Sequence, residues 1–70
     1  MKFNEFDVVE IAVDFPEYRI TAGTMATIID VYDNGDFEVE VANEEGDTIA
    51  FFSVKPEQVR PARKHETLAA

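Results

Sequence analysis

The sequence predicts an all-β fold in which five antiparallel strands curl into a small barrel. Three observations lead to this class. Residues 24–54 contain three apolar or alternating runs, two tight glycine-containing turns join these runs, and a short proline-bounded connection, KPEQVRP, follows. The pattern is typical of a small SH3-like five-stranded antiparallel barrel with a long first loop and a short helical turn before the last strand. We expect the barrel domain over residues 1–61 and a flexible C-terminal tail over residues 62–70.

The first strand and the first loop are expected at residues 7–13 and 14–23. The strand alternates valine and isoleucine with other residues, whereas the loop is too long for a tight turn and contains a proline. We expect an arched loop that Phe15, Tyr18 and Ile20 pin to the core. In the alternative, Phe15 and Tyr18 form an aromatic recognition surface.

The second strand is predicted over residues 24–32, with a break in its alternation. Ile28 and Ile29 are adjacent and apolar, which favours a bulge or a sharp coil. The Asp-Asn-Gly sequence at 33–35 then predicts a hairpin turn, because Asn-Gly supplies positive φ angles.

The third strand shows the clearest alternation in the chain, from Phe37 to Val41. One of its faces is apolar and the other is acidic. A turn is expected at residues 43–46 and a fourth strand at 48–54, which is apolar on both parities, so its inward face is not predicted. One helical turn and a very short fifth strand around Val59 complete the fold.

The charge is strongly negative and unevenly distributed, with a formal net charge of −9. Residues 1–53 carry thirteen acids against two bases, which gives −11, and residues 54–70 carry four bases against two acids, which gives +2. Such a surface repels nucleic-acid phosphates and anionic membranes and attracts basic proteins. In the alternative, the acids only keep a small domain soluble.

The composition also indicates in which cellular compartment the protein is expected. The sequence contains no cysteine, so it has no disulfide and no thiolate metal site, and it has no apolar run long enough to cross a bilayer. The N-terminus carries acids where a signal peptide needs an apolar run. We therefore expect a soluble, cytoplasmic protein.

Residues 6–61 resemble an uncharacterised family of small bacterial proteins, the domain of unknown function 4926. The resemblance rests on several motifs, namely Asp7-Val8-Val9, Asp14 with Pro16-Glu17-Tyr18, Gly23, Val31-Tyr32 before Gly35, Phe37-Glu38-Val39-Glu40, Gly46 and Gln58-Val59-Arg60-Pro61. The chain departs from the family at Arg19 and Ala26, where glycine is usual. The resemblance implies an SH3-like barrel that stands alone. It also implies an antitoxin or immunity role, since members are similar to proteins encoded beside small toxin genes, and it carries over no catalytic residues.

The residues predict neither an enzyme nor a cofactor or metal site. His65 is the only histidine and Ser53 the only serine, so neither a zinc site nor a nucleophile–base pair is expected. Acids and a glycine between Asp30 and Asp36 superficially suggest calcium, but this segment lacks the distal glutamate of an EF-hand and fits a hairpin turn better.

The best candidate site is an acidic row on the third strand and the turn after it. The predicted partner-binding residues are Asp36, Glu38, Glu40, Glu44 and Glu45, with Phe15 and Tyr18 from the first loop. Alternation places the first three on one face at intervals of roughly 7 Å. In the alternative, the acids protect an edge or exposed strand from aggregation.

Three functions remain open, of which we favour a protein that masks a basic partner, such as a toxin with a nucleic-acid-binding groove. The second is an accessory or homodimeric subunit, which exposure of Phe3, Phe6 or Phe52 would favour. The third is a KOW-like nucleic-acid or ribosome-associated module. The negative charge disfavours it, since only Arg60, Arg63 and Lys64 offer phosphate contacts.

Overall fold

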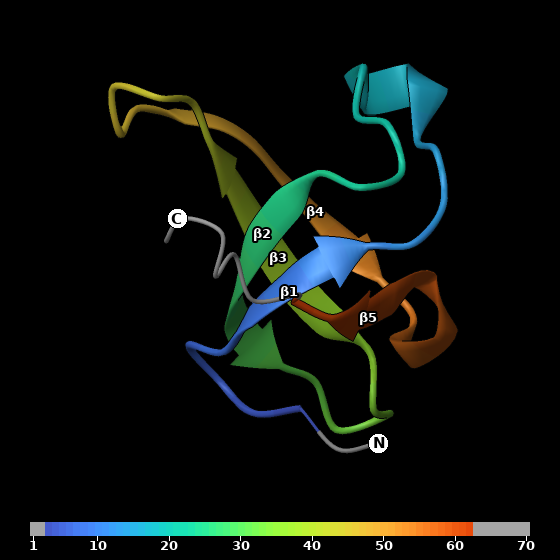
Figure 1. Cartoon of the computed structure of the whole chain (residues 1–70). Coiled ribbons are helices and arrows are strands. Elements are labelled where there is room, and N and C mark those ends of the chain that lie inside the picture. Colours follow the sequence, from blue (N-terminus) through green and yellow to red (C-terminus); the bar gives the residue numbers. More distant parts are fainter. Residues whose placement is uncertain (1–2, 63–70) are drawn as a thin grey trace, which may run out of the picture.

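The computed structural model describes residues 3–62, which form five strands and two single-turn 3-10 helices (Figure 1). The elements are β1 (Val8–Ile11), η1 (Pro16–Tyr18), β2 (Met25–Val31), β3 (Phe37–Ala42), β4 (Thr48–Val54), η2 (Pro56–Gln58) and β5 (Val59–Pro61). The predicted all-β class is confirmed, as are the long first loop and the helical turn before the last strand. Of the tail predicted over residues 62–70, residues 63–70 lie outside the described residues.

The five strands form one antiparallel sheet in the order β4-β3-β2-β1-β5. Consecutive strands are neighbours except β5, which returns to pair with β1. Its three residues pair with Val9, Glu10 and Ile11, and within the described residues β5 does not pair with β4. The sheet is therefore barrel-like but open between these two strands.

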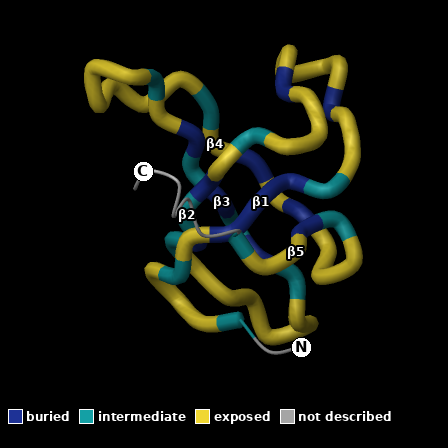
Figure 2. Tube along the Cα trace, in the orientation of Figure 1, coloured by how far each residue is buried: buried dark blue, intermediate teal, exposed yellow. Residues whose placement is uncertain are grey.

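Every strand contributes side chains to the core, and Figure 2 shows the buried residues along the middle of the strands, with the loops largely exposed. Val9, Ile11, Ile28 and Val39 are fully buried. The other buried apolar residues are Phe15, Ile20, Ala26, Phe37, Val41, Phe52, Val54 and Val59. The alternation predicted for β3 is confirmed, because its apolar residues face this core and its two glutamates do not.

Both predicted hairpin turns are present and share one geometry. The Gly35 N–H donates to the Tyr32 carbonyl at 2.9 Å, and the Gly46 N–H donates to the Asn43 carbonyl at 3.0 Å. The two glycines have φ angles of 95° and 88°, a region that residues with a Cβ atom rarely adopt. In the second turn, the Asn43 side-chain oxygen also accepts the N–H groups of residues 45 and 47.

Two register shifts interrupt the ladders of the sheet. The predicted irregularity in β2 is confirmed, because the pairing with β3 shifts between Ile28 and Asp30. The sequence did not predict the second shift, in which Ile49 is the extra residue of β4 between Thr48 and Ala50. A shift of one residue turns the side chains of all later residues in the strand to the opposite face of the sheet.

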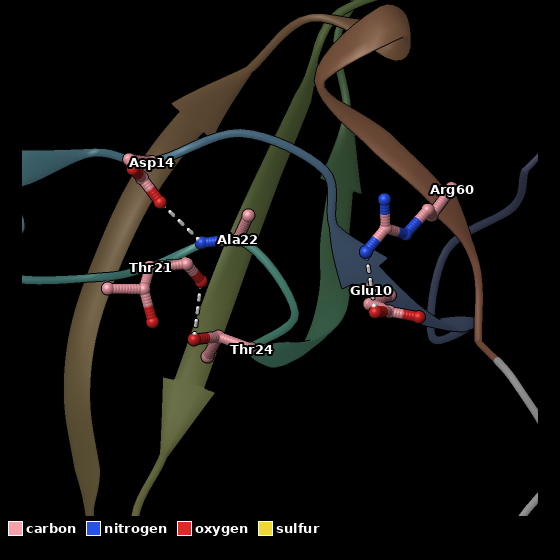
Figure 3. Close-up of polar contacts among 6 residues, drawn as sticks. All are labelled: Glu10, Asp14, Thr21, Ala22, Thr24 and Arg60. Carbon is pink, nitrogen blue, oxygen red and sulfur yellow. Dashed lines mark hydrogen bonds and ion pairs between the residues drawn. The ribbon is translucent and has the colours of Figure 1, made fainter.

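The first loop folds over one end of the core, as predicted. Phe15 and Ile20 are buried and form an isolated bridge, and the Phe15 and Tyr18 rings lie 5.0 and 4.6 Å from the Phe52 ring. The Asp14 carboxylate accepts the Ala22 N–H at 2.8 Å (Figure 3). The aromatic contacts attach the loop to β4, and the Asp14 hydrogen bond holds its two ends together.

Candidate functional site

The two residues of the acidic row that belong to β3, Glu38 and Glu40, lie on the outer face of the sheet. Glu38 and Glu40 alternate with buried residues of β3 and are themselves half-buried. Because β3 pairs with β2 on one side and β4 on the other, this row lies inside the sheet. β3 is therefore not an edge strand, and the alternative that these acids protect an exposed strand from aggregation stays a prediction.

Glu38 is held by two hydroxyl groups, one from Tyr32, which directly follows β2, and one from Ser53 of β4. Its carboxylate accepts the Tyr32 hydroxyl at 2.6 Å and the Ser53 hydroxyl at 3.1 Å. The hydrogen bond to Glu38 is the main reason why the pKa of Tyr32 is raised, because the carboxylate opposes formation of a phenolate. Asp30 lies directly opposite Glu38 on β2, so two carboxylates meet across adjacent strands.

Glu40 belongs to a line of paired residues that runs across β1, β2, β3 and β4. In this line, Val8 is opposite Thr27, Thr27 is opposite Glu40, and Glu40 is opposite Phe51. The Glu40 carboxylate accepts a hydrogen bond from the Thr48 hydroxyl. A shallow hollow beside it is lined by Val8, Met25, Ala26, Thr27, Glu40 and Ala42. The lining is mainly apolar and includes one carboxylate, which suits the aliphatic stem and charged end of a lysine or arginine.

Exposed apolar side chains surround the acidic row, and sequence reasoning did not include them in the site. Ile49 and Phe51 on β4 are 58% and 57% exposed, and Val8 on β1 is 53% exposed. The outward facing of Phe51 depends on cross-strand register, which a strand that is apolar on both parities does not reveal. We name the outer-face residues Val8, Asp30, Glu38, Glu40 and Phe51 the acidic–apolar face.

The other predicted site residues are not part of this face. Asp36 and the pair Glu44 and Glu45 lie on the turns at opposite ends of β3, where the Asp36 and Glu45 N–H groups donate to asparagine side chains. Phe15 is buried, and Tyr18 stacks on the inward-facing Phe52 ring. The structure thus brings Glu38 and Glu40 together but separates them from the predicted aromatic pair.

The cations of residues 3–62 do not neutralise the acidic row. The one ion pair in this part of the chain joins Arg60 of β5 to Glu10 of β1 at 2.7 Å (Figure 3). Glu10 is only 5% exposed, so its charge needs such a partner, and this contact raises the pKa of Arg60. The guanidinium of Arg60 is therefore already paired with a carboxylate of the same chain. The other predicted phosphate contacts, Arg63 and Lys64, lie outside the described residues.

The described residues contain no group of three or more His, Cys, Asp or Glu side chains arranged to hold a metal ion. His65 lies outside them. Within residues 3–62 there is also no helix with the length and apolar character needed to cross a membrane.

The geometry defines a barrel-like, open five-stranded domain with a mixed acidic and apolar outer face. Residues 5–61 match the family described as "Domain of unknown function (DUF4926)", and the chain belongs to this family. The resemblance found in the sequence is thereby confirmed. No curated protein and no solved structure matched the chain.

Proposed function

We propose that this chain is a non-catalytic protein-binding module of the antitoxin or immunity type, which masks a basic partner protein with its acidic–apolar face. One observation carries this proposal. Asp30, Glu38 and Glu40 are adjacent on that face, and among residues 3–62 none of them forms an ion pair. A lysine or arginine of a partner would relieve the repulsion between these carboxylates and gain charge-assisted hydrogen bonds.

The proposed mechanism is steric occlusion with electrostatic steering, and it needs no catalytic group. The net charge of −9 attracts a basic surface over a long range, which raises the association rate and makes it sensitive to salt. The exposed side chains of Val8, Ile49 and Phe51 supply apolar contact area once the partners meet. We place this activity in the cytoplasm, which suits a small domain without cysteines.

The test is capture of partners by the tagged full-length protein in extracts of its own host at low and at moderate salt, followed by mass spectrometry. We compare the wild type with the double variant Glu38→Gln, Glu40→Gln, which removes two charges and keeps the side-chain shape. The matched control is Glu17→Gln, Glu57→Gln, which removes two exposed acids on η1 and η2.

We expect to recover one small basic protein in an amount nearly equal to that of the tagged protein, and to recover less of it as the salt concentration rises. Recovery should fall with the outer-face variant and persist with the control. Equal recovery by both variants, or capture of one larger enzyme at any salt, would contradict masking by this face.

The exposed apolar residues favour a second candidate function, that of a homo-oligomeric or accessory subunit. Phe6 is 70% exposed, whereas the other two aromatic residues considered for this role, Phe3 and Phe52, pack against or within the core. Sedimentation equilibrium of the purified chain tests this candidate. A stable dimer at low concentration would favour it over masking, and a monomer would disfavour the homo-oligomer.

A further inference from the structure

The two edges of the sheet are protected to very different degrees. At one edge, β5 has only three residues, which include Arg60 and Pro61. At the other edge, β4 has seven residues, TIAFFSV, with no charge and no proline. Short strands, prolines and charges are the usual means by which an edge avoids pairing with other chains. The edge at β4 lacks all three, and its one β-bulge, at Ile49, lies near the start of the strand and leaves residues 50–54 in regular pairing with β3.

The backbone of β4 is also free along this edge. Its ladder runs to β3 alone, and among the described residues no other backbone hydrogen bond involves Thr48–Val54. In an antiparallel strand, alternate N–H and C=O groups point away from the neighbour. These groups form a row of donors and acceptors that an extended segment can pair with.

The outward side chains beside this edge define what an added strand would meet. Phe51 and Ser53 are exposed on β4, and behind them on β3 lie Glu40 and Glu38 respectively. An added strand would place its own outward residues about 5 Å from the β4 side chains. The β3 row would lie two strand spacings away, or about 10 Å. Because Ser53 is small, a long basic side chain opposite it has a clear path to the Glu38 carboxylate.

We propose that the free edge of β4 receives an extended segment of a basic protein as a sixth strand, with an apolar residue against Phe51 and a lysine or arginine opposite Ser53. The recognised feature is thus an apolar and a basic residue two positions apart in an extended segment. This inference rests on the proposed function, because it names how the masked partner is held.

Charge complementarity selects a basic segment over a second copy of this chain. A second β4 strand would bring no basic residue to meet Glu38 and Glu40, since TIAFFSV contains none. It would also bring together two molecules with a net charge of −9 each. A basic segment satisfies both the backbone edge and the carboxylates.

The first test uses the full-length protein and a capped peptide of about nine residues, a length within the usual range of strands. One face of the peptide alternates valine and lysine, and the other is threonine. In a titration followed by NMR, we expect amide shifts concentrated in residues 48–54. A peptide with glutamate in place of lysine should bind at least about tenfold more weakly.

Two further peptides carry N-methyl groups on every second backbone nitrogen, in opposite phases. Strand addition uses only one set of amides, so one phase should abolish binding and the other should keep it. Equal binding of both peptides would overturn the proposal, because side-chain contacts alone would then hold the segment.

A matched pair of protein variants separates this proposal from the masking function. Ser53→Lys places a positive charge at the edge and should weaken binding of the lysine peptide about tenfold or more, whereas Thr21→Lys makes the same charge change on the first loop and should not. If Glu38→Gln, Glu40→Gln reduces capture of the natural partner but Ser53→Lys does not, strand addition is wrong and masking stands. If neither of these two protein variants reduces capture, both strand addition and masking by this face are wrong. Amide shifts in residues 48–54 that depend on protein concentration alone would assign the edge to a second copy and overturn the proposal.

Discussion

At the scale of single residues, Arg19 has an unfavourable backbone conformation. Its φ angle is 59°, in the left-handed region, and its N–H donates to the Pro16 carbonyl at 3.0 Å to close η1. This conformation costs a residue with a Cβ atom about 1–2 kcal/mol. The family resemblance leads us to expect glycine at this position, which agrees with the geometry.

We expect Arg19→Gly to raise the free energy of unfolding by about 0.5–1 kcal/mol, because relief of the left-handed strain exceeds the added chain entropy of glycine. Urea denaturation measures the change. Arg19→Ala is the control, since it removes the side chain but keeps the Cβ atom, and it should not stabilise. A gain of equal size in both variants would assign the effect to the charge.

The hydrogen bond from Tyr32 to Glu38 predicts a dependence of stability on high pH. The raised pKa of Tyr32 in the folded state means that this hydrogen bond stabilises the fold fully below the ordinary tyrosine pKa of about 10. The stabilisation is lost as the pH rises through the higher pKa of the folded state. The difference in stability between the wild type and Tyr32→Phe should therefore shrink over this alkaline range.

The absorbance of tyrosinate measures the raised pKa of Tyr32 directly. In a Tyr18→Phe background, Tyr32 is the only tyrosine, so its titration is seen without overlap. The midpoint should be higher in the folded protein than in urea. Equal midpoints would show that Glu38 does not hold the Tyr32 hydroxyl in solution.

At the scale of elements, the extra residue in β4 decides which aromatic ring enters the core. Without the shift at Ile49, the hairpin would place Phe51 and Ser53 inward. With it, Phe52 and Val54 are buried, and Ser53 lies outside, where it bonds to Glu38. The observed register is favoured because it buries two apolar residues and leaves the serine hydroxyl with a partner.

Deletion of Ile49 should therefore be tolerated. It removes the extra residue and keeps Phe52 and Val54 in register, so we expect the free energy of unfolding to change by less than about 1 kcal/mol. Deletion of Ser53 is the contrast, because it turns Val54 outward and loses about 1.5–3 kcal/mol of burial. Thermal unfolding of both variants compares them, and equal loss of stability would show that the register does not depend on this residue.

At the scale of the whole molecule, uncompensated charge should weaken the fold. The chain carries fifteen acids and six bases, and the described residues contain a single ion pair. Self-repulsion of this kind destabilises a compact state and is screened by salt. We expect the melting temperature to rise by several degrees as NaCl increases from about 0.01 M to about 0.15 M, where the Debye length falls from about 30 Å to about 8 Å.

Circular dichroism melts measure this rise. Screening should be nearly complete at about 0.15 M, so the curve should flatten above that concentration. A melting temperature that stays constant at low salt and rises only at molar concentrations would point instead to a general salt effect on burial.

Much of the fold follows from patterns within short segments. Alternation over Phe37–Val41, the two asparagine- and glycine-containing turns and the adjacent pair Ile28 and Ile29 predicted β3, both hairpins and the irregularity in β2. These features are local, because a turn or a strand face depends on residues a few positions apart. The structure places Phe51 and Ser53 beside Glu40 and Glu38, which the sequence did not predict, and places Phe15 and Tyr18 of the first loop against Phe52 instead.

The sequence alone was sufficient for the all-β class, the positions of the strands and the excess of negative charge. Tertiary pairing decided that Phe52 rather than Phe51 is buried, that Asp30 lies against Glu38, and that Arg60 reaches Glu10 across fifty positions. Each of these depends on the register between strands that are distant in the chain. A strand that is apolar on both parities fits either register locally, so only the packing of the complete sheet selects one.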